Sequence, residues 1–358
     1  MLRLFLAWNE VKQNKLRFAL VVGVLLLVAY LVFFLSGLAN GLQNMNRAGV
    51  DKWKADGIML TEESDKNLQQ SSFSKNDVKD LDGGTFAELG ALNAIASAGD
   101  NSSGVAIFGL NPDEFIMPNV TEGKKFKETG EVIAADSLKD DGFKIGDTLK
   151  LSSSKEKLKI VGFTDDAKFN AAPILYGNME TFQKVRFAEA ADMNKDRINA
   201  YVIKSKDVSK VKAGKDLEVV KTDDFIQNLP GYTEQNLTVT LMIYFLFVIS
   251  AFIVAIFLYV LTIQKVSIFG VLKAEGISSG FLARSVIAQT SILAVAGVAI
   301  GLGLTILTGL FLPPAVPVAF NYLNMSLYGV TLIIVSMIGA LFSVLTIVKI
   351  DPLKAIGG

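Results

Sequence analysis

The sequence predicts a membrane protein with four transmembrane α-helices and a mixed α+β extracytoplasmic domain between the first and the second of them. Four windows are nearly free of charged residues, namely 18–42, 237–264, 286–320 and 327–348. Each supplies the roughly 20 apolar residues that a helix needs to cross a hydrocarbon core about 30 Å thick. Between the first two windows, charged residues and short alternating apolar runs indicate a folded domain outside the lipid.

The composition excludes several kinds of site. Hydrophobic residues make up 51% of the 358 residues, and the chain has no cysteine and no histidine. Disulfides, a thiol nucleophile, a zinc site of the usual ligands and a Ser-His-Asp triad are therefore ruled out. The formal net charge is zero, so we expect no nucleic-acid partner. Only Met, Tyr, Glu, Asp or neutral oxygen groups can reach the metal of a bound ligand.

The chain is predicted to begin with a cytoplasmic interfacial helix over residues 1–15. Apolar and charged positions alternate there around Trp8, and tryptophan is typical of the headgroup level. Residues 16–42 follow as transmembrane helix 1. A cleaved signal peptide is the alternative, but the apolar run from 18 to 42 exceeds the roughly 7–15 residues of a signal h-region. We therefore interpret it as a retained span.

The extracytoplasmic domain with its stalk is predicted over residues 43–233. Alternation over 130–166, broken by Gly, Asp and Ser, indicates half-buried strands, whereas 77–86 and 179–193 follow a helical period. Pro230 and Gly231 predict a turn before the next helix. The later elements are predicted as transmembrane helix 2 (234–263), a cytoplasmic loop (264–285), transmembrane helix 3 (286–312), a short outer loop (313–325), transmembrane helix 4 (326–349) and a cytoplasmic tail (350–358).

Basic residues near the span ends predict that both termini lie in the cytoplasm. Lys and Arg in short loops favour the cytoplasmic side, whereas long domains cross largely regardless of charge. The loop between helices 3 and 4 has no charged residue, which places it outside with the large domain. The basic residues that set this orientation are Arg3, Lys12, Lys15, Arg17, Lys265, Lys273, Arg284, Lys349 and Lys354.

The cytoplasmic loop QKVSIFGVLKAEGISSGFLARS, residues 264–285, is more elaborate than a plain connection between two spans. Val266, Phe269 and Gly270 can form an apolar helix face with Lys273 at its rim. Gly276 can end this helix in the left-handed conformation. The segment is either a docking helix for a partner or an interfacial helix that contacts only membrane lipid.

Three stretches of sequence make this order of elements distinctive: FFLSGLANGL, FLYVLTIQKVSIFGVLKAEGIS and DPLKAIGG. With them the chain resembles the MacB/FtsX-type permease subunits of ATP-binding-cassette (ABC) transporters. Within that family it is most similar to the HrtB-type haem-exporting permeases of Gram-positive bacteria. The family topology covers the whole chain, and it implies a homodimer in a bacterial cell membrane.

The resemblance also implies a cytoplasmic ATPase subunit, present in two copies, with a groove that receives a coupling helix from residues 264–285. The chain departs from the family pattern at Ser267 and Ile268, where many members carry an acidic residue, and at Glu275, where many carry an apolar one. No GxxxxGK[ST] motif occurs, so we expect ATP only on the partner and no enzymatic activity in this chain. The implied coupling residues are Val266, Phe269, Gly270, Lys273, Glu275 and Gly276.

Two polar stretches near the outer ends of spans 1 and 2 form the candidate substrate site, because polar groups at membrane depth indicate function. Gly37 and Gly41 form a small-xxx-small pair that lets two helices approach closely. The resemblance implies that spans 1 and 2 of two protomers meet there, near the symmetry axis. The predicted substrate-binding residues are Phe33, Asn40, Asn44, Met45, Arg47, Tyr232 and Glu234.

Haem is the transported ligand that this set fits, and no permanently bound cofactor is expected. Glu234, Met45 or Tyr232 can ligate the iron where histidine is absent, and weak ligation suits release. Propionates form charge-assisted hydrogen bonds with basic groups. The basic groups in reach by sequence are Arg47 together with Lys52 or Lys54.

Structural roles compete with each of these assignments. Glu234 can serve only as a helix cap, because a carboxylate is favoured in a first helical turn. Met45 can be a packing residue, Phe33 can face lipid or a partner helix, and the basic residues can form a solvated helix face.

The resemblance implies a mechanism of mechanical closure of an outer-leaflet cavity between two protomers. The sequence fits this expectation, because the spans show no breaks or midplane charges typical of alternating access. Two other functions remain open. One is export of another amphiphile such as an antibiotic, a peptide or a lipid. The other is an FtsX-like transmembrane signalling scaffold.

Overall fold

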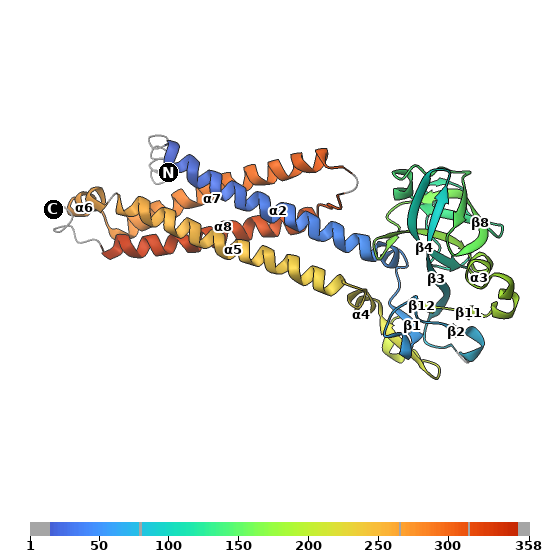
Figure 1. Cartoon of the computed structure of the whole chain (residues 1–358). Coiled ribbons are helices and arrows are strands. Elements are labelled where there is room, and N and C mark those ends of the chain that lie inside the picture. Colours follow the sequence, from blue (N-terminus) through green and yellow to red (C-terminus); the bar gives the residue numbers. More distant parts are fainter. Residues whose placement is uncertain (1–14, 79–80, 265, 314–315, 350–358) are drawn as a thin grey trace. The chain divides into compact units, whose positions relative to one another are not determined.

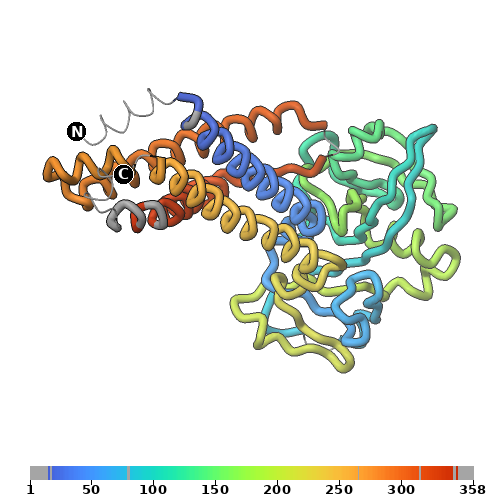
Figure 2. Tube along the Cα trace, turned by 60° about the vertical axis from the view of Figure 1, so that its left-hand side comes forward, coloured from blue at the N-terminus to red at the C-terminus, as the bar shows by residue number. Residues whose placement is uncertain are grey.

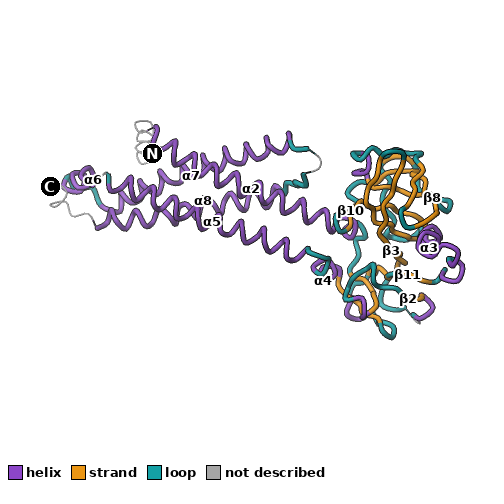
Figure 3. Tube along the Cα trace, viewed as in Figure 1, coloured by secondary structure: helices purple, strands orange, loops and turns teal. Residues whose placement is uncertain are grey.

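The computed structural model describes residues 15–78, 81–264, 266–313 and 316–349. Apart from Lys15, the predicted interfacial helix and the cytoplasmic tail lie outside these residues. The chain divides into two compact units (Figure 1). The helical unit comprises residues up to 41 and from 237 onward, and the sheet unit comprises 42–236. Figure 3 separates the helices of the first from the strands of the second.

Among the described residues, four helices are long and apolar enough to cross a membrane, as predicted. Their bounds differ from the expected spans mainly at α2, whose 37 residues run to Asp51 and not to residue 42, and at α7, which begins at Ser279 and not at residue 286. At 1.5 Å per residue α2 is about 55 Å long, well beyond a hydrocarbon core of about 30 Å. The four helices are α2 (Lys15–Asp51), α5 (Tyr232–Ile263), α7 (Ser279–Phe311) and α8 (Tyr322–Lys349).

Glycines set the closest helix contacts in the helical unit. A Cβ atom at Gly297 would lie 2.7 Å from the Leu25 Cβ, and one at Gly301 would lie 2.9 Å from the Ala29 Cβ, so α7 lies directly against α2. Gly339 on α8 approaches a main-chain carbonyl of α5 in the same way, at 2.6 Å. Small residues supply the close van der Waals packing on which helix association in lipid depends.

A short helix, α6 (Val266–Ala274), joins α5 to α7. It lies at the same end of the helical unit as the start of α2 and the end of α8 (Figure 2). Gly276 has φ +93° and its N–H donates to the Lys273 carbonyl, while the Ile277 N–H donates to the Leu272 carbonyl. This is a Schellman motif, and it confirms the prediction that Gly276 ends the helix in the left-handed conformation.

The sheet unit confirms the predicted mixed α+β domain. Its main sheet has the strand order β13-β1-β12-β3-β4-β10-β6-β8-β5, with β7 on β3 and β8, and β9 on β10. β11 and β2 pair separately. The strands are β1 (Gly57–Thr61), β2 (Phe73–Ser74), β3 (Thr85–Ala98), β4 (Asn101–Leu110), β5 (Glu122–Gly123), β6 (Glu131–Ala135), β7 (Thr148–Leu151), β8 (Ser154–Thr164), β9 (Lys168–Phe169), β10 (Ala172–Asn178), β11 (Arg197–Ile198), β12 (Ala200–Lys204) and β13 (Leu217–Lys221).

Two helices accompany the sheet, α3 (Met179–Phe187) and α4 (Thr222–Gln227). The Asn178 side chain caps α3 by accepting the Thr181 N–H at 2.8 Å. The helix predicted over 77–86 is wrong, because a 3-10 turn ends at Asp77 and β3 begins at Thr85. Gly83 adopts φ +92° between them, a conformation that glycine permits and that stops a helix.

An aromatic cluster fixes the end of α2 to the sheet. Trp53, two residues beyond α2, is 1% exposed, and its ring centroid lies 6.3 Å from those of Phe108 on β4 and Phe225 on α4. Phe108 in turn packs against Phe169 and Tyr176 at 5.4 and 5.9 Å. The core of the sheet unit therefore reaches the point where the chain leaves α2.

Candidate functional site

The last turns of α2 and the first turn of α5 lie side by side within the sheet unit. Gln43 Nε2 donates to Asn236 Oδ1 at 2.7 Å, and Asn46 Nδ2 donates to Gln235 Oε1 at 3.3 Å. Arg47 Nη1 donates to the hydroxyl of Tyr232 at 3.4 Å. The structure thus brings together the two stretches that were predicted to converge. We call the six residues Gln43, Asn46, Arg47, Tyr232, Gln235 and Asn236 the polar seam.

The four amides of the polar seam were missed by the sequence reasoning, although a signal for them exists. On α2 the seam occupies positions i, i+3 and i+4 from residue 43, and on α5 it occupies the same positions from residue 232. Residues three and four apart share one helix face. Two polar triplets with this spacing predict facing polar stripes.

Arg47 is the one charged residue of the polar seam. Its Nε and Nη2 each donate to a carboxylate oxygen of Asp51 at 2.8 Å, which forms a bidentate ion pair one turn along α2. The Tyr232 side chain that Arg47 also contacts is 6% exposed and packs in the core of the sheet unit with Trp53. Tyr232 is thus held on two sides, by its ring and by its hydroxyl.

Glu234 lies away from Tyr232. It is exposed in the first turn of α5, whereas Tyr232 is buried. At 3.6 residues per turn, residues i and i+2 of a helix point about 200° apart around its axis. The structure therefore pairs Tyr232 with Arg47 but does not bring Tyr232 and Glu234 to one face of one protomer. A carboxylate in this turn also stabilises the helix through its dipole.

Asn44 and Met45 lie on α2 between the seam residues Gln43 and Asn46. Asn44 is exposed and Met45 is half-buried. The main chain here is docked on a tight loop of the sheet unit. The Ala171 N–H donates to the Met45 carbonyl at 3.0 Å and the Asn170 N–H donates to the Asn46 carbonyl at 3.2 Å. A loop from the sheet therefore fixes the backbone position of Met45.

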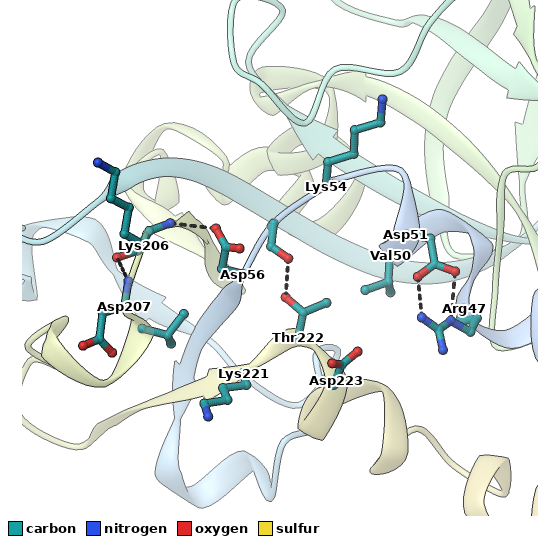
Figure 4. A pocket seen from close by; sticks show the side chains of 13 residues that line it. Arg47, Val50, Asp51, Lys54, Asp56, Lys206, Asp207, Lys221, Thr222 and Asp223 are labelled. Atoms are coloured by element: carbon teal, nitrogen blue, oxygen red, sulfur yellow. Dashed lines mark hydrogen bonds and ion pairs between the residues drawn. The ribbon is translucent and has the colours of Figure 1, made fainter.

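The two lysines considered for an anionic ligand differ in their bonding. Lys52 Nζ lies 2.8 Å from a carboxylate oxygen of Asp165, and this ion pair lowers the pKa of Asp165. Lys54 is exposed and, among the described residues, is in no ion pair. Lys54 and Arg47 line a cavity of about 510 Å³ (Figure 4). Its other charged lining residues are Asp51, Asp56, Lys206, Asp207, Lys221 and Asp223, so the lining has no net charge.

Two predicted substrate residues lie in the helical unit. Phe33 is 1% exposed and belongs to a packed cluster with Val32, Phe247 and Leu332. This burial removes Phe33 from any surface that a ligand could reach in one protomer, because neighbouring helices cover its ring. Asn40 is half-buried, and its Nδ2 is buried with no hydrogen-bond partner among the described residues.

The apolar face expected on α6 points inward. Phe269, Leu272 and Ile277 pack against Leu282 and Val286 of α7. In this contact Phe269 and Leu272 are half-buried. Of the other predicted coupling residues, Gly270 is buried, Val266 and Lys273 are half-buried, and Glu275 and Gly276 are exposed.

The outward face of α6 instead presents Ile268 and Val271, which are 57% and 45% exposed. They lie three residues apart and so form one apolar strip. The docking face predicted from the sequence lies one residue away from this strip, because both sides of this short helix are apolar.

Comparison with known families decides what kind of protein carries this arrangement. The family description "MacB-like periplasmic core domain" matches residues 18–217, and "FtsX-like permease C-terminal" matches residues 240–352. The chain belongs to the MacB/FtsX family of permeases. It is a multi-pass membrane protein and an ABC transporter permease, and membership of the family implies a partner ATPase subunit.

Relatives of this permease match it along its whole length. HrtB from Staphylococcus epidermidis, a permease named for a hemin transport system, is 29% identical and is aligned over 99% of each chain. HrtB from Staphylococcus haemolyticus is 26% identical over the same shares. An uncharacterized ABC transporter permease from Mycobacterium tuberculosis is 23% identical, again over 99% of each chain.

Proposed function

We propose that this permease exports haem from the membrane. The observation that carries the proposal is the whole-length similarity to two permeases named for hemin transport, at 29% and 26% identity over 99% of each chain. The residues at the junction of α2 and α5 are chemically suited to such a cargo. Haem is a flat apolar ring with two carboxylates and an iron that accepts a weak axial ligand.

Basic groups near the end of α2 are the proposed partners of the haem propionates. Arg47 retains Nη1 for a further acceptor in addition to its two bonds to Asp51, and its present contact through that atom, 3.4 Å to Tyr232, is long. Lys54 lines the same cavity. A carboxylate that meets a guanidinium forms a charge-assisted bond, which is roughly twice as strong as a neutral one.

The proposed iron ligand is Glu234 or Met45. Glu234 is exposed and Met45 is half-buried, whereas Tyr232 is held in the core of the sheet unit and would have to leave it to reach the iron. A carboxylate or a thioether binds ferric haem less firmly than a thiolate, and a cargo must be released. Glu234 from each of two protomers could approach the iron from opposite sides.

The proposed mechanism needs a homodimer and two ATPase subunits. ATP binding draws the ATPases together, and they displace α6 through Ile268 and Val271. Closure of the helices then expels haem from an outer-leaflet cavity. We propose that both termini and α6 lie on the cytoplasmic side of the bacterial cell membrane, because basic residues gather at those ends.

ATP hydrolysis in a reconstituted complex tests this function. The full chain and its cognate ATPase subunit are placed in nanodiscs, and hydrolysis is measured against haemin concentration. We expect saturable stimulation by haemin, and none in a complex that carries Ile268→Asp. Saturable stimulation by an unrelated amphiphile, with none by haemin, would replace haem as the cargo. Indifference to every amphiphile would favour a signalling scaffold.

A further inference from the structure

The connection from α7 to α8 crosses α2 in the helical unit. We call residues Val316–Phe320 the outer strap. The Ala319 N–H donates to the Gly37 carbonyl of α2 at 2.9 Å. Asn321 then begins α8, because its Oδ1 accepts the N–H groups of Leu323 and Asn324 at 3.1 Å each. The strap is thus bonded to α2 at one end and continues directly into a capped helix at the other.

Three glycines make room for the strap. A Cβ atom at Gly41 would lie 2.0 Å from the Pro317 carbonyl oxygen, and one at Gly37 would lie 2.8 Å from the Phe320 ring. A Cβ atom at Gly309 on α7 would lie 2.2 Å from the other side of the same ring. The Phe320 ring therefore fills a notch between α2 and α7 that any larger residue would close.

The glycine pair was expected to let a second helix approach, and within the chain the strap occupies that face. A helix carbonyl has two lone pairs, so the Gly37 oxygen can accept the Ala319 N–H in addition to its helical bond. Release of the strap would break this bond and would also separate the Phe320 ring from Gly37 and Gly309.

Other contacts extend the junction between α2 and α7. The Tyr30 hydroxyl lies 3.3 Å from the Thr308 hydroxyl, and Gly297 and Gly301 hold the two helices in direct contact further along. Contacts at three successive levels leave α2 little freedom to move past α7. In contrast, α6 precedes α7 directly and is packed on its first turns.

We infer that the outer strap is a clamp that makes α2 and α7 move as one body, with Phe320 as its positioning residue. A displacement of α6 by the ATPase then reaches α2 through α7, without a separate contact between α6 and α2. This inference rests on the closure mechanism proposed above, but it does not depend on haem as the cargo.

Hydrogen exchange of the unmodified full chain tests the clamp. The complex with its ATPase is compared without nucleotide and with ADP trapped by vanadate, and exchange is followed for peptides over residues 37–41 and 316–321. We expect equal protection in both states. Exchange at Ala319 that is about tenfold or more faster in the trapped state would overturn the clamp, because the strap would then open during the cycle.

Substitutions sharpen the same test. Gly41→Ala should raise exchange at Ala319, because its methyl group displaces the Pro317 carbonyl. Gly303→Ala on α7 and Gly23→Ala on α2 are matched controls, since nothing lies within 4 Å of a Cβ at either position. Unchanged exchange in Gly41→Ala would contradict the clamp. If haemin fails to stimulate ATP hydrolysis while the protection pattern is as expected, the cargo is wrong and the clamp stands.

Discussion

The guanidinium of Arg47 on α2 donates to the hydroxyl of Tyr232 on α5 at 3.4 Å and holds Asp51 with two bonds of 2.8 Å. The residues that this contact joins are 185 positions apart. It closes the sheet unit at the point where the chain enters from one membrane helix and leaves by another. The polar seam therefore links the two helices that connect the sheet unit to the rest of the chain.

Two substitutions of Tyr232 separate the role of its hydroxyl from that of its ring. Tyr232→Phe removes only a long hydrogen bond and should cost at most about 1 kcal/mol of unfolding free energy. Tyr232→Ala empties a core site and should cost about 3 kcal/mol or more. Thermal unfolding of the purified full chain measures both. A Tyr232→Phe variant as unstable as Tyr232→Ala would show that the hydroxyl bond had been undervalued.

The seam amides should be energetically coupled across the two helices. In a double-mutant cycle, Gln43→Ala and Asn236→Ala should interact by about 1 kcal/mol, because each single change breaks the same 2.7 Å bond. The matched control cycle combines Asn44→Ala with Asn236→Ala. Asn44 is exposed, so these two substitutions should show no interaction. Urea unfolding of the full chain supplies the free energies, and equal coupling in both cycles would refute a specific bond.

Binding of the ATPase should depend on Ile268 and Val271 more than on Phe269. Ile268→Asp places a charge in the outward apolar strip and should weaken association about tenfold or more, the effect of losing an interface anchor. Ala274→Asp is the control, since Ala274 is also exposed on α6. Affinity is measured by titration of immobilised permease with the ATPase subunit. Unimpaired binding by Ile268→Asp would return the docking face to the residues predicted from sequence.

The sheet unit should lose stability in acid through Glu131. Hydrogen bonds from the Lys127 and Glu128 N–H groups, with Lys124 nearby, lower the pKa of this carboxyl. A carboxyl whose folded pKa is lowered stabilises the fold above its unfolded pKa, and this contribution is lost as the pH falls through the folded pKa. Glu131→Gln should therefore lower the melting temperature at pH 7 but have little effect below about pH 3.

Glu63→Gln provides the control for this pH series, because the Glu63 side chain is exposed. It should leave the melting temperature unchanged across the series. A Glu131→Gln deficit that is the same at neutral and acid pH would mean that packing, not ionisation, accounts for it.

The sequence predicted correctly those elements that depend on residues close together in the chain. Four charge-free windows predicted the membrane helices, and a glycine at the right place predicted the end of α6 at Gly276. The family resemblance implied that residues 40–47 would lie near Tyr232 and Glu234. The bonds of the seam follow from helix periodicity once both helices are known to face each other.

Contacts that depend on the whole packing were not predictable in the same way. The Gly37–Gly41 spacing indicates close approach but not what approaches, and the structure puts the outer strap there. The sequence predicted that the aromatic ring of Phe33 would contact the ligand, yet neighbouring helices bury it. Ile268 and Phe269 are equally apolar, and only the docking of α6 on α7 decides which one points outward.

Haem binding at the junction of α2 and α5 is the central claim, and a haemin titration of the purified full chain tests it most directly. The Soret band is followed for the native protein and for Glu234→Ala, Arg47→Ala and the exposed control Lys125→Ala. We predict saturable binding near one haem per dimer, an altered spectrum in Glu234→Ala, and an affinity about tenfold lower in Arg47→Ala, equivalent to about 1.4 kcal/mol. Absence of saturable binding, or binding that is identical in all four proteins, would contradict the claim.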